Sequence, residues 1–168
     1  MPNYALMTSV GKDRPGIVAA ISGVLLDADC NIEDSQMSRL GPDFACMLML
    51  ALPEGMTGDQ LAQKLEPVRA EFGLWIRLAD VPPEMVKYET YGQPVYLIHV
   101  YGADRKGIVH KISTHLASQS VNVTNLHTEV IPHEKPLYVM LIEVEVPPFV
   151  DTGKLQDDLK KIGSEIGV

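Results

Sequence analysis

The sequence predicts an α+β protein of two ferredoxin-like βαββαβ units in tandem, each with an antiparallel four-stranded sheet and two helices on one face. The first observation is a repeat. The segment "GKDRPGIVAAISGVLLDADCNIED" from Gly11 returns as "GADRKGIVHKISTHLASQSVNVTN" from Gly102, with ten of 24 positions identical. The second observation is that strand-like and helix-like segments alternate in the order β-α-β-β-α-β in the first copy. A repeat of this length indicates a duplicated structural unit.

The first strand and helix of each copy are predicted from apolar content and spacing. "YALMTSV" and its counterpart "VYLIHVY" are short, β-prone and mostly apolar, as a central strand should be. The repeated segment then predicts a helix, in which Ile17, Val18, Ile21 and Leu25 are expected to face the sheet.

The remaining elements follow in the same order in both copies. "FACMLMLAL" and "LYVMLIEVEV" predict the third strands, and the loop before the latter, residues 131–136, is the longer of the two. A 4-3-4 spacing of apolar residues then predicts the buried face of a second helix. That face comprises Leu61, Leu65, Val68 and Phe72 in the first copy and Leu155, Leu159, Ile162 and Ile166 in the second.

The domain boundaries follow from the repeat. Residues 1–81 form the first unit, whose fourth strand is predicted at residues 74–81. Residues 82–94 contain three prolines and a glycine and predict a linker. Residues 95–168 form the second unit, in which no segment corresponds to the fourth strand. We therefore expect an uncovered sheet edge there, which proteins usually avoid. Either the sequence stops short of this strand, or something else supplies or replaces it.

The repeated turn has a structural interpretation. Glycine at positions 11 and 102 allows a sharp change of direction after the first strand. Asp13 and Asp104 can cap the helix that follows, and Pro15 suits its first turn. Asn31 and Asn122 end the same helices, where a left-handed conformation is common.

The same turn also has a functional interpretation. A helix N-terminus after a glycine loop can hold a carboxylate, and Arg14 or Arg105 could grip that group through two hydrogen bonds. An ammonium or hydroxyl group could be received at the start of the second strand, by Asn31, Asn122, Asp34 or Asn125. A site with a carboxylate end and an amine end suits a free amino acid.

Composition and motifs exclude several function classes. The net charge of −8 argues against direct nucleic-acid binding, and no segment is long and apolar enough to span a membrane. The start of the chain has no export signal, so a cytoplasmic protein is expected, with Cys30 and Cys46 reduced. No nucleophile, phosphate-loop or dinucleotide motif is present, so we expect neither an enzyme nor a cofactor. The five histidines lack metal-ligand spacing; they are His99, His110, His115, His127 and His133.

The D-R-P-G-I-V and N-I-x-D-S segments resemble those of ACT domains, the small-molecule-binding modules of amino-acid metabolism. The chain as a whole is similar to the glycine cleavage system transcriptional repressor family, and in part to the ACT portions of formyltetrahydrofolate deformylases. The resemblance implies side-by-side pairing of units, as in a homodimer, and effector binding between units. The residues implied are Gly11, Asp13, Arg14, Gly16, Asn31 and Asp34, with Asp104, Arg105, Gly107, Asn122 and Asn125 in the second copy.

The second copy departs from the pattern, with Lys106 in place of proline and Asn125 in place of aspartate. The two sites need not bind the same ligand. The resemblance implies an amino-acid sensor, for glycine or serine, that modulates expression of glycine and one-carbon metabolism by contacting a transcription activator protein. The alternatives are a ligand-free assembly module and a regulatory subunit of an amino-acid-metabolism enzyme.

Overall fold

A computed structural model describes residues 3–86, 93–132, 134 and 136–168. The chain divides into two compact units, Met1–Tyr88 and Glu89–Val168. The predicted turn at residues 131–136 includes positions 133 and 135, and the predicted linker at residues 82–94 includes 87–92; these positions lie outside the described residues. No helix in the described part is long and apolar enough to cross a membrane.

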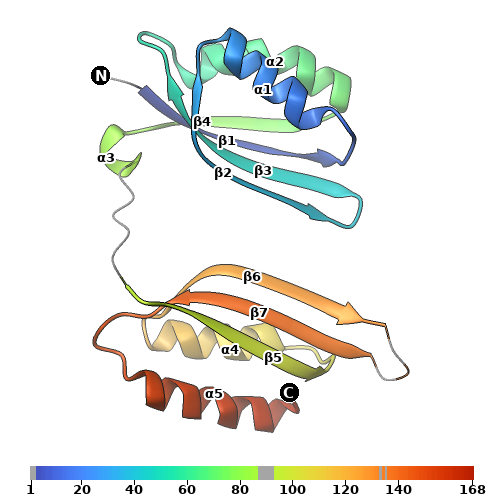
Figure 1. Ribbon diagram of the computed structural model, residues 1–168, viewed down its shortest axis with the longest axis vertical. Coiled ribbons are helices and arrows are strands. Elements are labelled where there is room, and N and C mark those ends of the chain that lie inside the picture. The colour runs from blue at the N-terminus through green and yellow to red at the C-terminus, as the bar shows by residue number, and fades with distance from the viewer. Residues whose placement is uncertain (1–2, 87–92, 133, 135) are drawn as a thin grey trace. The chain divides into compact units, whose positions relative to one another are not determined.

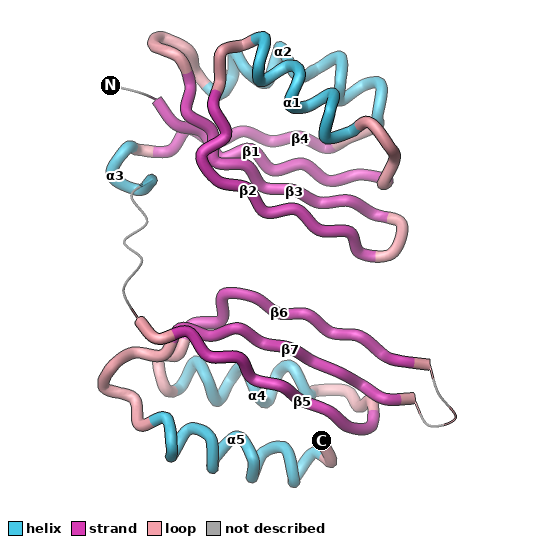
Figure 2. Tube along the Cα trace, in the orientation of Figure 1, coloured by secondary structure: helices cyan, strands magenta, loops and turns pink. Residues whose placement is uncertain are grey.

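The first unit contains a four-stranded antiparallel sheet in the order β2-β3-β1-β4. Figures 1 and 2 show helices α1 and α2 together on one face of this sheet. Its elements are β1 (Asn3–Lys12), α1 (Ile17–Asp27), β2 (Asn31–Leu40), β3 (Asp43–Leu52), α2 (Gly58–Phe72), β4 (Trp75–Val81) and α3 (Pro83–Val86). The short helix α3 lies in the segment predicted as linker, where Pro83 occupies the first helical position, which tolerates its missing N–H.

The second unit repeats this order, with three strands in its described part, arranged β5-β7-β6. Its elements are β5 (Val95–Ala103), α4 (Ile108–Ser118), β6 (Asn122–Ile131), β7 (Leu137–Glu145) and α5 (Thr152–Ile166). Helices α4 and α5 again cover one face of the sheet (Figure 1). The predicted ferredoxin-like α+β class is confirmed in both units.

Each unit has its own hydrophobic core between the sheet and its two helices. Leu61, Leu65 and Val68 of α2 are buried, and Phe72 packs against them, as the 4-3-4 spacing predicted. Ile17, Ile21 and Leu25 of α1 are buried too. The prediction for Val18 was wrong, since its side chain is 54% exposed. A helix presents one residue in three or four to the sheet, and position 18 lies beside the buried stripe.

Candidate functional site

The repeated turn ends in a glycine that begins the first helix of each unit. Gly16 and Gly107 are the N-cap residues of α1 and α4, with left-handed φ angles of 98° and 94°. Neither helix has a side-chain cap, so the predicted capping by Asp13 and Asp104 was wrong. The N-cap glycines lie three residues beyond these aspartates, and Asp13 instead lies 3.7 Å from a guanidinium nitrogen of Arg39. The turn predicted the position of the helix correctly but not its N-cap.

The second helix of each unit begins differently. Thr57 caps α2, its hydroxyl accepting the Gln60 N–H in a reciprocal capping box. Asp151 caps α5, its carboxylate accepting from the N–H groups of Gly153 and Lys154. Of the four helices α1, α2, α4 and α5, it is therefore α1 and α4 whose first N–H groups are not accepted by a side chain of their own cap. A helix N-terminus of this kind attracts an anion, because free N–H donors and the helix dipole act together.

Arg14 is held against the far end of α2. One guanidinium nitrogen donates to the main-chain oxygen of Glu71 at 2.9 Å, and the guanidinium carbon lies 5.2 Å from the centre of the Phe72 ring. In the second unit, Arg105 lies against Gly167, just beyond α5: a Cβ built on Gly167 would be 3.2 Å from its Cζ atom. The recurrence of arginine thus has a structural reason, because each arginine contacts the C-terminal turn of the second helix.

Gly11 and Gly102 allow another part of the chain to pass close to the strand, and they do not change the direction of the chain. Both lie inside strands, β1 and β5, and neither is among the glycines with positive φ. A Cβ on Gly11 would lie 2.7 Å from Leu74 Cδ2, and one on Gly102 would lie 2.6 Å from Val168 Cα. The prediction of a sharp turn at these glycines was wrong, because the chain leaving the second helix passes directly over them.

The asparagines begin the second strands rather than end the helices. Asn31 is the first residue of β2 and Asn122 the first of β6. The left-handed residues are Asp29, with φ 56°, and Ser120, with φ 60°, so the helix-end role predicted for asparagine was wrong. Aspartate shares asparagine's tolerance of this conformation, which explains why it can occupy position 29.

A β-bulge in each sheet changes which face these polar residues share. In the first unit Asn31 pairs with Ala51 and Asp34 with Met49, because the register shifts between residues 32 and 34. Residues 31 and 34 would point to opposite faces of a regular strand. The extra residue brings them to the same face, that of Ala51 and Met49, which is opposite to the buried Leu50.

The second unit has the same bulge, between residues 123 and 125. Asn122 pairs with Glu145 and Asn125 with Glu143, on the face away from the helices. The Asn122 amide nitrogen lies 3.4 Å from Glu145 Oε2, and the Thr124 hydroxyl donates to Glu143 Oε1 at 2.7 Å. This polar group is acidic, which suits the ammonium end of a ligand.

The turn and the asparagine of one unit lie far apart. Gly11 pairs with Phe44 on β3, whereas Asn31 pairs with Ala51, seven residues along the same strand. At about 3.3 Å per residue the separation is about 23 Å. An amino acid cannot reach both groups within one unit. The structure brings Asp13, Arg14 and Gly16 together, and Asn31 and Asp34 together, but it does not join the two groups.

A shallow hollow of about 590 Å³ adjoins the turn of the second unit. Asp104, Arg105 and Gly107 line it, together with Ser113 of α4 and Tyr138 of β7. Burial raises the pKa of Tyr138, and the nearby Asp104 carboxylate raises it further, so the phenol stays protonated. Tyr138 was not predicted, because it lies outside the repeated segment. Ser113 was missed although it recurs, opposite Ser22 in the repeat, because it lies within helix α4 and not in the turn.

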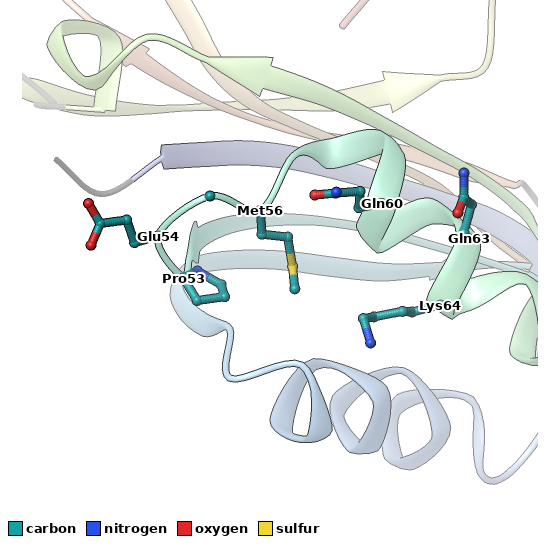
Figure 3. A pocket seen from close by; sticks show the side chains of 7 residues that line it. Pro53, Glu54, Met56, Gln60, Gln63 and Lys64 are labelled. Atoms are coloured by element: carbon teal, nitrogen blue, oxygen red, sulfur yellow. The ribbon is translucent and has the colours of Figure 1, made fainter.

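A second hollow, in the first unit, lies at the opposite end from the turn. Figure 3 shows Met56 and Lys64 among the side chains that line it, from the β3–α2 connection and from α2. Cys30, which precedes Asn31, contacts this region, with Cys30 Sγ 3.9 Å from Met56 Sδ. The hollow therefore belongs to the asparagine end of the unit.

Metal binding has no support in the described part of the chain, where no three His, Cys, Asp or Glu residues gather. His99 instead shares a hydrogen bond of 3.1 Å with the Tyr101 hydroxyl. Both cysteines are free thiols, Cys46 buried and Cys30 partly so.

Comparison with known proteins agrees with this architecture. The family model for the ACT domain matches residues 3–79. The glycine cleavage system transcriptional repressor of Escherichia coli (strain K12) is 24% identical over 173 residues, covering 98% of this chain and 86% of that protein. A UPF0237 protein of Methanopyrus kandleri is 38% identical over 71 residues, covering 42% of this chain and 79% of that protein.

The fold also matches a solved structure. The crystal structure of an unknown protein from Galdieria sulphuraria has a TM-score of 0.84 and 26% identity, over 99% of this chain and 94% of that chain. Two ferredoxin-like units, each with an uncapped helix after the repeated turn, define a tandem of two modules of one structural class. The chain belongs to the ACT-domain family.

Proposed function

We propose that this protein is a regulatory amino-acid sensor that binds glycine or serine between ACT units and acts on gene expression through protein contacts. The observation that carries the proposal is the difference in capping. Thr57 and Asp151 cap the second helices, whereas α1 and α4 begin without a side-chain cap at Gly16 and Gly107. A carboxylate from a small ligand supplies the acceptor that these helices lack.

The proposed site combines two units. The ligand carboxylate binds at the turn of one unit, near Gly16 and Arg14 or near Gly107 and Arg105. Its ammonium group binds at the polar face of a neighbouring unit, near Asn31 and Asp34 or near Asn122 and Asn125. The separation of about 23 Å within a unit requires this arrangement. Pairing of two copies, as in a homodimer, is the simplest way to supply the neighbour.

The proposed role in gene expression is based on similarity to a known regulator. The Escherichia coli relative is a glycine cleavage system transcriptional repressor. With a net charge of −8, this chain is poorly suited to bind DNA itself. We therefore propose that it contacts a transcription activator protein in the cytoplasm and has no catalytic activity of its own.

A thermal-shift comparison of glycine, L-serine, glycinamide and ethanolamine tests the proposal. Glycine or serine should raise the melting temperature, because a ligand bound only by the folded state stabilises it. Glycinamide and ethanolamine lack the carboxylate and should give no shift. Equal shifts with all four would contradict binding at the helix N-termini.

Two variants and one control locate the site. Asn31→Ala and Asn122→Ala should each reduce the glycine-dependent shift while leaving the melting temperature of the free protein within about 2 °C, since both side chains are exposed. Asn3→Ala, whose amide donates to the Met56 oxygen outside the proposed site, should keep the full shift.

The ligand-free assembly module remains the second candidate. The contact of Arg14 with Glu71 and Phe72 favours it, because this contact explains the arginine without a ligand. A flat response to all twenty amino acids, in a protein that is dimeric by sedimentation, would establish this second candidate.

A further inference from the structure

The two repeated turns differ in what borders the start of the helix. In the first unit the Phe72 ring lies beside it, since a Cβ built on Gly16 would be 3.6 Å from Phe72 Cζ. Ile166 holds the equivalent position of the second unit, 94 residues later. There a Cβ built on Gly107 would meet no atom of the described chain within 4 Å. The N-terminus of α4 therefore has open space beside it, where a ligand's side chain can lie.

The acidic residue of the turn also has different neighbours in the two units. In the first unit an Asp13 carboxylate oxygen lies 3.7 Å from a guanidinium nitrogen of Arg39 on β2. The equivalent residue of β6 is Val130, which holds the same place in the register with the neighbouring strand. A valine side chain carries no charge and donates no hydrogen bond. Asp104 therefore lacks the neighbour that engages Asp13, and its carboxylate can accept from a ligand.

A buried phenol distinguishes the second unit further. Tyr138 of β7 occupies the position that Phe44 holds in β3. It is only 8% exposed, and it lines the hollow of about 590 Å³ together with Asp104 and Gly107. Its hydroxyl donates to Met140 Sδ at 3.6 Å, and a thioether sulfur is a weak acceptor. The hollow thus contains a buried donor that would gain by bonding to an oxygen atom.

Asp104 and Tyr138 together suit one particular chemical group. Burial raises the pKa of Tyr138, and the nearby Asp104 charge raises it further, so the phenol is a donor at neutral pH. The Asp104 carboxylate is an acceptor. An aliphatic hydroxyl group donates one hydrogen bond and accepts others, so it can satisfy both side chains at once. A hydrogen atom or a methyl group satisfies neither.

The charge of the second turn also suits an amino acid. Lys106 follows Arg105, whereas Pro15 follows Arg14 in the first unit. Two cations therefore adjoin Asp104 in the sequence and offset its charge. A ligand carboxylate at the start of α4 is attracted by these cations and by the helix dipole.

We propose that the hollow beside the second turn binds the side chain of an amino acid with a β-hydroxyl group, of which L-serine is the smallest. The hydroxyl donates to Asp104 and accepts from Tyr138, while the carboxylate lies at Gly107. The first turn has Phe44 and Phe72 in the equivalent places and does not select for a hydroxyl. This inference rests on the proposed function and names the ligand class for one of its two sites.

Isothermal titration of the full chain with four ligands tests the inference: L-serine, L-alanine, O-methyl-L-serine and glycine. L-serine should bind with a Kd about tenfold or more below that of L-alanine, because alanine leaves both buried partners without a hydrogen bond. O-methyl-L-serine cannot donate to Asp104 and should also bind several-fold more weakly than serine. Glycine reports on the carboxylate and ammonium contacts alone.

A matched pair of variants assigns the selectivity to the second unit. Tyr138→Phe should reduce the ratio of the alanine Kd to the serine Kd to about threefold or less, while the glycine Kd stays within about twofold. Phenylalanine already occupies the equivalent position 44, so we expect this variant to fold. Phe44→Tyr is the control and should keep the full ratio. If Tyr138→Phe fails to fold, the four ligands on the unaltered chain decide.

The outcomes separate this inference from the function on which it rests. No binding of any of the four ligands would overturn the proposed function and the inference with it. Binding of glycine, with serine no tighter than alanine, would overturn the inference alone. An unchanged ratio in Tyr138→Phe, or an equal loss of glycine and serine binding, would likewise reject Tyr138 as the residue that recognises the hydroxyl.

Discussion

The guanidinium of Arg14 donates a hydrogen bond to the main-chain oxygen of Glu71, with nitrogen and oxygen 2.9 Å apart. The contact joins the turn before α1 to the last helical turn of α2, across 57 positions of sequence. A cation at this end of a helix is also favoured by the helix dipole. The turn proposed to bind a ligand is therefore anchored by one of its own residues to the second helix.

Arg14→Ala should lower the free energy of unfolding of the ligand-free protein by about 1 kcal/mol, because it removes an exposed hydrogen bond and the contact with Phe72. Urea denaturation measures this change. Arg14→Lys retains the charge but not the planar group and should recover part of the loss. If both variants match the unaltered protein in stability but lose the glycine response, Arg14 serves the ligand and not the fold.

Gly11→Ala should be destabilising, by about 1–3 kcal/mol, because the added methyl would overlap the buried Leu74 side chain. Gly23→Ala is the matched control: it lies inside α1 with no atom within 4 Å of its added Cβ. Replacing a helical glycine by alanine should stabilise the protein by up to about 1 kcal/mol. Thermal melts of the two variants should move in opposite directions, and a shift of both in one direction would contradict the close packing of Gly11.

Ser9→Ala should leave stability unchanged or raise it by up to about 1 kcal/mol. The Ser9 hydroxyl is fully buried and has no hydrogen-bond partner among the described residues, so its removal loses no contact of this kind. The repeat supports this expectation, since the equivalent residue of β5 is Val100. Ser38→Ala, on the exposed strand β2, is the control and should have little effect. A clear loss of stability in Ser9→Ala would show that the hydroxyl is satisfied in solution.

Alkaline pH should destabilise the first unit through its thiols. Burial raises the pKa of both Cys30 and Cys46 above the ordinary thiol value of 9.0; the Asp29 charge raises that of Cys30 further. The folded state therefore favours the protonated thiols. Their contribution is fully present below pH 9.0 and is lost as the pH rises through the folded pKa values. Urea denaturation of Cys46→Ala and of the unaltered protein across pH 7–10.5 should show a steeper loss in the latter.

The repeat made most of the fold predictable. Local apolar spacing, which dominates element formation, predicted the order of elements along the chain, the buried faces of α2 and α5, and the fourth strand of the first unit. Local patterns did not distinguish Val18 from its buried neighbours, because a run of four apolar residues around it suits either side of a helix. The boundary at Gly16 was missed because Asp13 is a common capping residue and the true cap is defined by backbone conformation.

The candidate site was predictable in its parts and not in its arrangement. Arg14 and Asn31 were identified from the repeat, but the contact of Arg14 with Glu71 depends on a residue distant in sequence. The bulge that turns Asn31 and Asp34 to one face has no distinct signature in "NIEDS". Register shifts of this kind depend on how two strands meet, which a single strand does not reveal.

The shared bulge also makes β2 and β6 structurally equivalent strands. Both strands contain ten residues, begin with asparagine and shift register at the third. A chimaera that exchanges residues 31–40 with residues 122–131 would keep every main-chain pairing with β3 and β7 and alter side chains alone. The two halves of the protein are thus modular at the strand that carries half of the candidate site, and a binding preference could be transplanted from one half to the other without redesigning either sheet.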